Sequence, residues 1–358
     1  MNNSFFYKDK PLFGLDIGTT SVKVMQLAPQ KNKTKERIVQ GYGLAHYEKP
    51  AFHKGVLKEP EIIAKAINKI FSKSLIGTIN TRRVAMSLPV ANTYNRVLSL
   101  PIINKKELAQ AVRLEAEQYI PVASEELYID YTVISNDKKM QEVLISAVPQ
   151  KIVDSYLGLT ELLGIELVSL ESTIAAAERL VSFNEENEAP TILIDFGSLS
   201  VDISIYDKRL VVTGTVSGGG DTFTELIANN LQVSEQVAYT IKSKYGLNVS
   251  KKQSEIKQAL EPTLNSITKE IKKMIRYYED RSQNDKHVEQ IITLGGGSNL
   301  PGLSDYLTDT LRLPVRMSNP WVKNLVFNNL QPPSLLEQSM YITVAGLALL
   351  DEKKVWND

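Results

Sequence analysis

Two segments of this chain, far apart in the sequence, carry an aspartate, a glycine and hydroxyl residues in the same order after a short apolar run. Glycine has no side chain, so neighbouring backbone N–H groups can approach a polyphosphate closely, and hydroxyl groups can donate further hydrogen bonds to it. One such turn alone would be interpreted as an ordinary hairpin, but its duplication favours two phosphate-binding turns. The residues concerned are Asp16, Gly18, Thr19 and Thr20 in the first copy and Asp195, Gly197 and Ser198 in the second.

The charged residues of these segments could balance the charge of a phosphate ligand. Asp16 and Asp195 end their apolar runs where a hydrated Mg²⁺ beside phosphates needs hard oxygen ligands, although an aspartate that caps a turn is a common alternative. Lys23 follows in the returning strand, where its charge could face phosphate oxygens. A solvated lysine at a sheet edge is an equally good interpretation of Lys23.

Further glycines stand at two later junctions. Gly218 and Gly219 open a long helical region, and Gly295 to Gly297 follow a short apolar strand at 290–294. A turn of this kind between a strand and a helix suits close packing of an adenine ring or a phosphate against bare backbone. The serine and asparagine at 298–299 could cap the helix that follows. A Walker P-loop is absent, and the glycine triplet comes too late in the chain for a dinucleotide-binding βαβ unit.

The elements that would position these residues form two similar halves. Each copy of the motif predicts a strand, a tight turn and a returning strand. A chain of 358 residues is long enough for about two domains. An apolar stripe at helical spacing over 61–75 predicts a core-facing helix in the first half, and a broken helical region is expected from 221 to about 283 in the second.

A self-contained block from about 83 to 149 lies between the two copies. It combines a small sheet with an amphipathic helix, which predicts an inserted α+β subdomain. Its expected elements are strands at 84–88 and 94–100, a helix at 105–119, and a hairpin that pairs 127–134 with 142–148.

Composition excludes several classes of function. The 41 Lys and Arg residues equal the 41 Asp and Glu residues, so a nucleic-acid partner is disfavoured. The chain has no Cys and only three His, which excludes thiolate sites and disfavours histidine-based metal sites. The first ten residues lack the apolar core of a signal peptide, and the apolar stretch 342–350 is about half of the roughly 20 residues needed to cross a bilayer. These features predict a cytoplasmic protein.

The order of a phosphate hairpin, its echo and a late strand–glycine turn resembles the superfamily of actin, sugar kinases and heat-shock chaperone ATPase domains. Within it, the block at 83–149 resembles the inserted subdomain of the PilM family of type IV pilus assembly proteins. The resemblance covers nearly the whole chain. It rests on Ser87-Leu88-Pro89, Asn95 to Pro101, Leu127 to Tyr131 and, most specifically, Glu115-Ala116-Glu117-Gln118-Tyr119-Ile120-Pro121.

This resemblance implies an α/β, actin-like (ribonuclease H-like) fold of two lobes with duplicated sheet-and-helix domains and a small inserted α+β subdomain. The first lobe would comprise residues 1–82 and 151–189, with the inserted, partner-binding subdomain at 83–150. The second lobe would comprise 190–220 and 289–358, with a helical subdomain at 221–288, and its last segment would return to the first lobe.

The resemblance also implies function. ATP and Mg²⁺ would bind between the lobes, and a cleft beside the inserted subdomain would receive the short cytoplasmic tail of a PilN-like membrane protein. Other pilus platform proteins and the assembly motor are further candidate partners. The protein would be peripheral to the inner membrane through its partner, without direct membrane insertion. The implied nucleotide-binding residues are Asp16, Gly18, Thr19, Thr20, Lys23, Asp195, Gly197, Ser198, Gly218, Gly219, Lys242, Gly295, Gly296 and Gly297, with Asp16 and Asp195 also on the metal.

The sequence departs from relatives at two positions, Tyr239 and Val201. Lys242 is kept in a helix where relatives carry Ala-Glu-x-x-Lys, but Tyr239 replaces the glutamate that reaches the ribose. Val201 stands where relatives often have Thr. Glu171 falls near the position that orients the attacking water in superfamily enzymes, although an acid at the start of a helix over 171–181 is the preferred interpretation. At most slow ATP hydrolysis is expected.

Two other functions remain as alternatives. The cell-division protein FtsA is a filament-forming relative that reaches the membrane through a C-terminal amphipathic helix, and the ending of this chain over 351–358 is too short and acidic for one. A sugar or acid kinase of the same superfamily would need a general base beside the acceptor hydroxyl, and none is evident.

Overall fold

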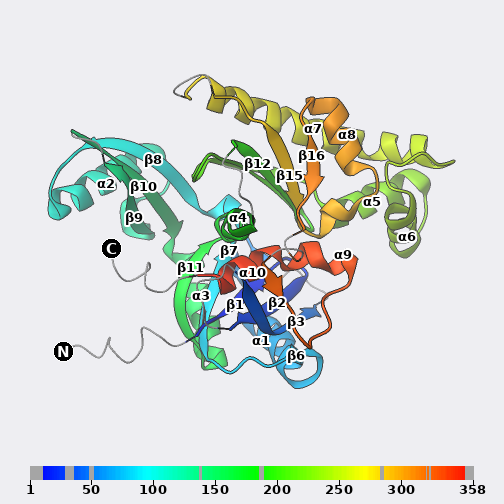
Figure 1. Cartoon of the computed structure of the whole chain (residues 1–358), viewed down its shortest axis with the longest axis horizontal. Coiled ribbons are helices and arrows are strands. Elements are labelled where there is room, and N and C mark those ends of the chain that lie inside the picture. The colour runs from blue at the N-terminus through cyan, green and yellow to red at the C-terminus, as the bar shows by residue number, and fades with distance from the viewer. Residues whose placement is uncertain are drawn as a thin grey trace.

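The two copies of the duplicated motif form the centres of two separate sheets, one in each lobe (Figure 1). The computed structural model describes residues 11–28, 36–47, 52–136, 139–184, 189–282, 286–319, 321 and 324–350. The N-terminal and C-terminal segments considered above, 1–10 and 351–358, lie outside the described residues.

The first lobe contains a seven-stranded sheet in the order β11-β7-β1-β2-β3-β17, with β6 paired to β3. The central strand β1 is antiparallel to β2 and parallel to β7. Because β1, β2 and β7 are buried along their whole length, polar residues within them, such as Lys23 and Gln26 of β2, need partners inside the protein. The strands are β1 (Phe13–Ile17), β2 (Ser21–Leu27), β3 (Arg37–His46), β6 (Ile76–Gly77), β7 (Arg83–Leu88), β11 (Glu166–Ser172) and β17 (Leu325–Val326).

Helices cover both faces of this sheet. One face packs against α1 (Pro60–Lys69), which continues as a π-helical turn η2 (Ile70–Ser74), and against α3 (Gln150–Leu163). The opposite face packs against α4 (Thr173–Asn184) and α10 (Ile342–Ala348). A small hairpin of β4 (Phe52–His53) and β5 (Val56–Leu57) lies beside α3. The apolar stretch at 342–350 thus largely forms a buried core helix that packs on the first-lobe sheet.

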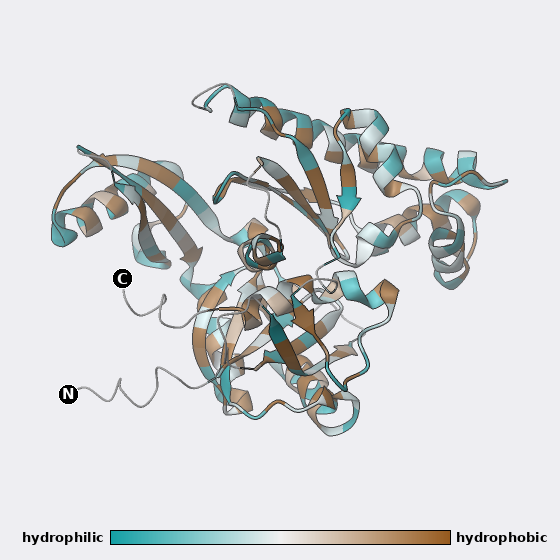
Figure 2. Cartoon of the chain, in the orientation of Figure 1, coloured by the Kyte–Doolittle hydropathy of each residue, from teal (hydrophilic) through white to brown (hydrophobic). Residues whose placement is uncertain are grey.

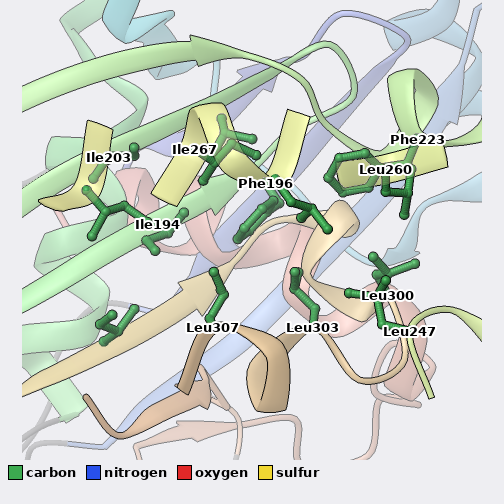
Figure 3. Close-up of a cluster of buried hydrophobic side chains, with 14 of the residues drawn as sticks. Ile194, Phe196, Ile203, Phe223, Leu247, Leu260, Ile267, Leu300, Leu303 and Leu307 are labelled. Atoms are coloured by element: carbon green, nitrogen blue, oxygen red, sulfur yellow. The ribbon is translucent and has the colours of Figure 1, made fainter. Parts of the chain in front are cut away.

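The second lobe contains a five-stranded sheet in the order β14-β13-β12-β15-β16. Its strands are β12 (Thr191–Phe196), β13 (Ser200–Tyr206), β14 (Leu210–Ser217), β15 (Gln290–Leu294) and β16 (Val315–Met317). Its helices are α5 (Gly220–Leu231), α6 (Glu235–Tyr245), α7 (Gln253–Glu279) and α8 (Leu303–Leu311). Phe196, Phe223 and Leu260 join a fully buried core between sheet and helices (Figure 3). The apolar face of α7 follows the predicted helical spacing, and polar residues alternate with it along the helix (Figure 2).

The inserted subdomain is a three-stranded antiparallel sheet in the order β8-β10-β9, covered on one face by α2. Its elements are β8 (Tyr94–Pro101), α2 (Lys105–Tyr119), β9 (Leu127–Asn136) and β10 (Met140–Pro149). Asn104 and Glu107 form a capping box at the start of α2, so the predicted helix begins at the predicted residue. The 3₁₀ turn η3 (Val90–Asn92) forms the neck that joins the subdomain to the first lobe.

Three boundaries differ from the sequence prediction. The strand at 83–88 belongs to the first-lobe sheet, because it pairs in parallel with β1 and β11, so the inserted sheet begins only at Tyr94. The helix expected from Glu171 begins at Thr173, since Glu171 still pairs with Ser87 in the sheet. Neither residue 298 nor residue 299 caps α8: both lie in the 3₁₀ turn η5 (Gly296–Asn299), and the N-cap is Gly302.

No helix among the described residues is both long enough and apolar enough to span a bilayer.

Candidate functional site

The two predicted turns meet between the lobes. The hydroxyl oxygen of Thr20, in the β1–β2 turn, lies 3.2 Å from that of Ser198, in the β12–β13 turn. Each turn is closed in the same way, because the Gly18 N–H donates to the Ser21 carbonyl at 2.8 Å and the Gly197 N–H donates to the Ser200 carbonyl at 3.0 Å. The duplicated sequence therefore folds into duplicated turns, and the fold brings them face to face.

Both turns leave backbone donors without a partner. Within the described part of the chain, the N–H groups of Thr19, Thr20 and Ser198 donate no hydrogen bond. The carbonyls of the second turn are occupied instead, since the Gly197 and Ser198 oxygens accept N–H groups from the start of α5. Free N–H groups in adjacent turns form a concave surface that favours an anion. The arrangement fits the oxygens of a polyphosphate.

Glycines allow three backbone segments to approach one another at this point. Gly219 has a φ of 125°, and a Cβ there would lie 2.5 Å from the Gly197 carbonyl oxygen. Gly295 has a φ of 80°, and a Cβ there would lie 2.1 Å from a carboxylate oxygen of Asp195. A Cβ on Gly297 would lie 3.0 Å from the Phe196 carbonyl oxygen. The turn that precedes α5 and the turn that follows β15 thus pack directly onto the β12–β13 turn and the end of β12.

The remaining glycines of these turns differ in their surroundings. Gly218 is buried with a φ of 148°, whereas Gly296 is exposed and lies beside Met340. Met340 belongs to the 3₁₀ turn η6 (Ser339–Tyr341), which precedes α10. The late glycine triplet therefore contacts the segment that returns to the first lobe.

Asp16 and Lys23 form a buried pair under the first turn. Lys23 Nζ lies 3.0 Å from Asp16 Oδ2, and both side chains are at most one-tenth exposed. Ser87 donates its hydroxyl hydrogen to the other oxygen, Oδ1, at 2.7 Å. The interpretation of Lys23 as a solvated edge residue is therefore wrong. The lysine charge is held beside Gly18, where an added Cβ would lie 3.4 Å from Nζ.

Asp195 faces this pair from the second lobe. Burial raises its pKa to about 7, and the nearby carboxylates of Asp202 and Asp16 add to the rise, while Lys23 opposes it. Asp202 is the register partner of Asp195 on β13. Burial raises the pKa of Asp202 to about 6, although hydrogen bonds from Thr215 and Thr173 act in the opposite direction. The site thus concentrates carboxylates that a cation would stabilise.

The carboxylates fit a hydrated cation better than a protein-only metal cage. No cluster of three or more His, Asp or Glu side chains suitable for a metal occurs in the described ranges. Mg²⁺ commonly keeps several waters and takes one or two carboxylates together with phosphate oxygens. Asp16 and Asp195 could supply that number of protein ligands.

Lys242 reaches from α6 to the start of α5. Its ammonium group donates to the Gly220 carbonyl at 2.6 Å and to the Thr224 hydroxyl at 2.8 Å, and burial lowers its pKa. The ring of Tyr239 lies 5.0 Å from the same ammonium group, and Tyr239 is 58% exposed. The aromatic ring of Tyr239 therefore occupies the position at which relatives carry the glutamate of the Ala-Glu-x-x-Lys pattern.

Glu171 forms an ion pair with Arg179. Arg179 on α4 donates to both of its carboxylate oxygens, one of them at 2.6 Å, and also donates to the Gly346 carbonyl at 2.9 Å. The glutamate is thereby held against α4 and α10, and its role toward water remains a prediction.

Several residues of the site were missed by the sequence analysis. Ser87 and Asp202 contribute as described, and Tyr47 donates its hydroxyl hydrogen to the Gly18 carbonyl. Ser87 and Asp202 could have been noticed as polar residues inside apolar strands, because buried polar groups need partners. Tyr47 carries no such signal.

A comparison with known protein families decides the relationship. The model of the family described as type IV pilus assembly protein PilM matches residues 14–352. The chain belongs to the PilM family. Its fold is actin-like: a solved structure titled as a PilM–PilN type IV pilus biogenesis complex has a TM-score of 0.80 at 24% identity, covering 95% of this chain and 98% of that one.

More distant relatives agree with this fold. MreB5 of Spiroplasma citri, solved with AMPPNP bound, has a TM-score of 0.57 at 14% identity and covers 98% of both chains. Among curated proteins, the cell division protein FtsA of Buchnera aphidicola is 22% identical in an alignment 388 positions long, gaps included, that covers 95% of this chain and 90% of that protein. The family model that matches this chain is that of PilM, and FtsA is a relative at low identity.

Proposed function

We propose that this PilM-family protein binds ATP with Mg²⁺ between its lobes and, depending on the nucleotide, binds the cytoplasmic N-terminal tail of a PilN-like membrane protein. In this role it is a cytoplasmic component of the inner-membrane platform of a type IV pilus or a related type II secretion system. It lies at the membrane through its partner.

The observation that carries the proposal is the approach of the two turns across the lobes, with Thr20 and Ser198 3.2 Å apart and free N–H groups on both sides. A triphosphate placed there would receive donors from both lobes and favour their closed arrangement. A ligand shifts such an equilibrium only through its different affinity for the two states. A related fold, MreB5, has been solved with a nucleotide analogue.

The remaining residues have separate roles in this proposal. Asp16 and Asp195 hold the hydrated Mg²⁺, which neutralises phosphate charge, and the ion pair with Lys23 holds the Asp16 carboxylate in place. Lys242 and the glycines at 218–219 and 295–297 border the nucleoside end. Because Arg179 holds both carboxylate oxygens of Glu171, that side chain is not free to orient water, which supports slow hydrolysis.

The tail is proposed to dock at the seam between the inserted sheet and the first lobe. One face of that sheet packs against α2. β9 is the edge strand of that sheet nearer the first lobe. Its Tyr128 donates a hydroxyl hydrogen bond to the Asp154 carboxylate on α3 at 3.1 Å. Tyr128 and Leu157 are 47% and 38% exposed, so the seam offers apolar surface beside a carboxylate. The solved PilM–PilN complex supports a partner of this kind.

The test is fluorescence anisotropy with a labelled PilN-tail peptide and the full chain, with and without ATP and Mg²⁺. We expect saturable binding whose affinity changes with nucleotide, and loss of binding in Leu157→Glu. Leu335→Glu, at a 77% exposed position of α9 (Leu335–Gln338) outside the seam, is the matched control. Failure to bind in both conditions would refute the partner assignment.

A further inference from the structure

The β13–β14 hairpin connects the nucleotide site with the inserted subdomain. At its base, β13 begins directly after the Gly197–Leu199 turn and β14 ends directly before Gly218. Both ends of the hairpin therefore lie in segments that surround the proposed phosphate position. Its tip, residues 207–209, is the part farthest along the two strands from that position.

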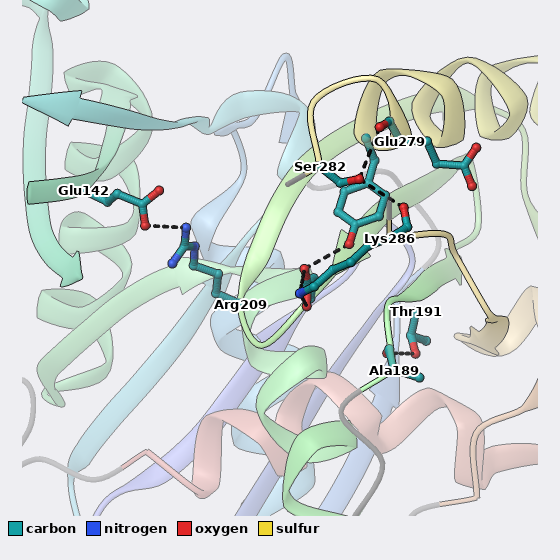
Figure 4. A network of polar contacts seen from close by, with 9 residues as sticks. Glu142, Ala189, Thr191, Arg209, Glu279, Ser282 and Lys286 are labelled. Carbon is teal, nitrogen blue, oxygen red and sulfur yellow. Dashed lines mark hydrogen bonds and ion pairs between the residues drawn. The ribbon is translucent and has the colours of Figure 1, made fainter. Parts of the chain in front are cut away.

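The tip contacts two other parts of the molecule. Arg209 pairs with Glu142 on β10 of the inserted subdomain at 2.7 Å (Figure 4). Asp207 accepts hydrogen bonds from Lys286, in the segment before β15, at 2.7 Å and from the Tyr278 hydroxyl on α7 at 2.9 Å, which fixes the tip to the rest of the second lobe. Glu142 also accepts the hydroxyl hydrogen of Ser135 at 2.7 Å, so its carboxylate is oriented toward the hairpin.

The side of the hairpin is in contact with the same subdomain. β14 is the edge strand of the second-lobe sheet, and it lies against β8 and against the neck turn η3. On β13, Asp202 accepts hydrogen bonds from Thr215 of β14 at 2.7 Å and from Thr173 of the first lobe at 3.4 Å. A change in the angle between the lobes would move β14 against β8 and the Arg209 side chain against Glu142.

We propose that the β13–β14 hairpin transmits the nucleotide state to the inserted subdomain, with the Arg209–Glu142 ion pair as the contact at its tip. The inference rests on the proposed ATP binding and adds the route by which ATP regulates the partner site. The route is direct: one hairpin touches the phosphate turn at its base and the inserted sheet at its tip.

The contact has the strength that a reversible switch requires. The Arg209 and Glu142 side chains are 40% and 37% exposed, and exposed ion pairs change equilibria by only about two- to fivefold. A pair of this strength biases the position of the subdomain without locking it. The tip itself stays in place, because Lys286 and Tyr278 hold Asp207.

The test is amide hydrogen exchange of the full chain with and without ATP and Mg²⁺, read in β8 and β10. In the wild type we expect ATP to change the exchange rate there by about two- to fivefold. Arg209→Glu and Glu142→Arg should each abolish this change, and the double variant, which reverses the pair, should restore it. Lys252→Glu, which breaks the exposed Lys252–Glu255 pair near the start of α7, is the matched control and should behave as wild type.

Calorimetry with ATP and Mg²⁺ on the same variants separates this inference from the proposed function. Equal ATP affinity with lost exchange changes in the single variants supports the hairpin route. If the single variants keep the full ATP-dependent change, or if the wild type binds ATP without any change in β8 and β10, the route is refuted. If neither the wild type nor any variant binds ATP, both this inference and the proposed nucleotide binding are refuted. That conclusion holds whether or not the PilN-tail peptide binds.

Discussion

At the scale of single residues, the carboxylate of Asp16 is shared between Lys23 at 3.0 Å and the Ser87 hydroxyl at 2.7 Å. Removing one partner of a buried ion pair leaves the other charge uncompensated, which costs more than the pair itself contributes. The network therefore links the stability of the first lobe to the residues that would face the nucleotide.

We expect Lys23→Met to lower the free energy of unfolding by about 3–5 kcal/mol, because Asp16 is left buried and unpaired. Adding Asp16→Asn should recover much of the loss. Urea unfolding of the two single variants and the double variant measures the coupling. Lys273→Met, which removes a 70% exposed lysine, should stay within about 0.5 kcal/mol of wild type. A Lys23→Met variant as stable as this control would contradict the buried pair.

The raised pKa of Asp195 determines how we expect the stability of the nucleotide-free protein to depend on pH. Its pKa is raised from 3.8 to about 7 in the fold, so the native state holds a proton that the unfolded chain releases. Stability from this group is therefore complete below about pH 4 and is lost as pH rises toward 7, by up to about 1.4 kcal/mol per pH unit. Asp195→Asn should be more stable than wild type at pH 8 and similar at pH 4. Urea unfolding in EDTA at the two pH values measures this, and a variant that is less stable at pH 8 would contradict the shift.

At the scale of elements, the site is a set of turns in which Gly219 and Gly295 leave no room for a side chain. Gly219 combines a φ of 125° with a Cβ position 2.5 Å from the Gly197 carbonyl oxygen. A substitution there must move α5 away from the second turn. The turn that would hold phosphate and the start of α5 are therefore one unit.

Gly219→Ala should lower the free energy of unfolding by at least about 1–3 kcal/mol, since backbone strain and the close carbonyl both oppose it. Gly158→Ala is the matched control: it lies inside α3 with no neighbouring atom within 4 Å of the added Cβ, so it should stabilise the protein by about 0.5–1 kcal/mol. Thermal unfolding compares the two. Equal effects of the two substitutions would show that the turns are not in close contact.

The sequence was informative where signals are local. The amphipathic pattern over 105–119 and the two strand segments at 127–134 and 142–148 were sufficient to predict α2 and the β9–β10 hairpin. The membership of 83–88 in the first sheet depends on parallel pairing with β1, which no local pattern encodes. The partners Arg179 of Glu171 and Ser87 of Asp16 depend on packing between elements, so their contacts could not be predicted either.

At the scale of the whole molecule, the two lobes are held together by buried apolar residues as well as by the polar site. Leu193 and Leu294 of the second sheet share a core with Ile174 of α4 and with Val344 of α10. Motion between the lobes must therefore be a small rearrangement around this core. The two turns contact each other across the lobes through Thr20 and Ser198, so a ligand bound to both could stabilise one arrangement.

The measurement that tests this account most directly is isothermal titration calorimetry of the full chain with ATP and Mg²⁺, compared with adenosine. If two turns grip the triphosphate, one saturable site should appear, and ATP should bind at least about tenfold more tightly than adenosine, or about 1.4 kcal/mol. The absence of binding heat for ATP, or equal affinity for adenosine and ATP, would contradict the central claim.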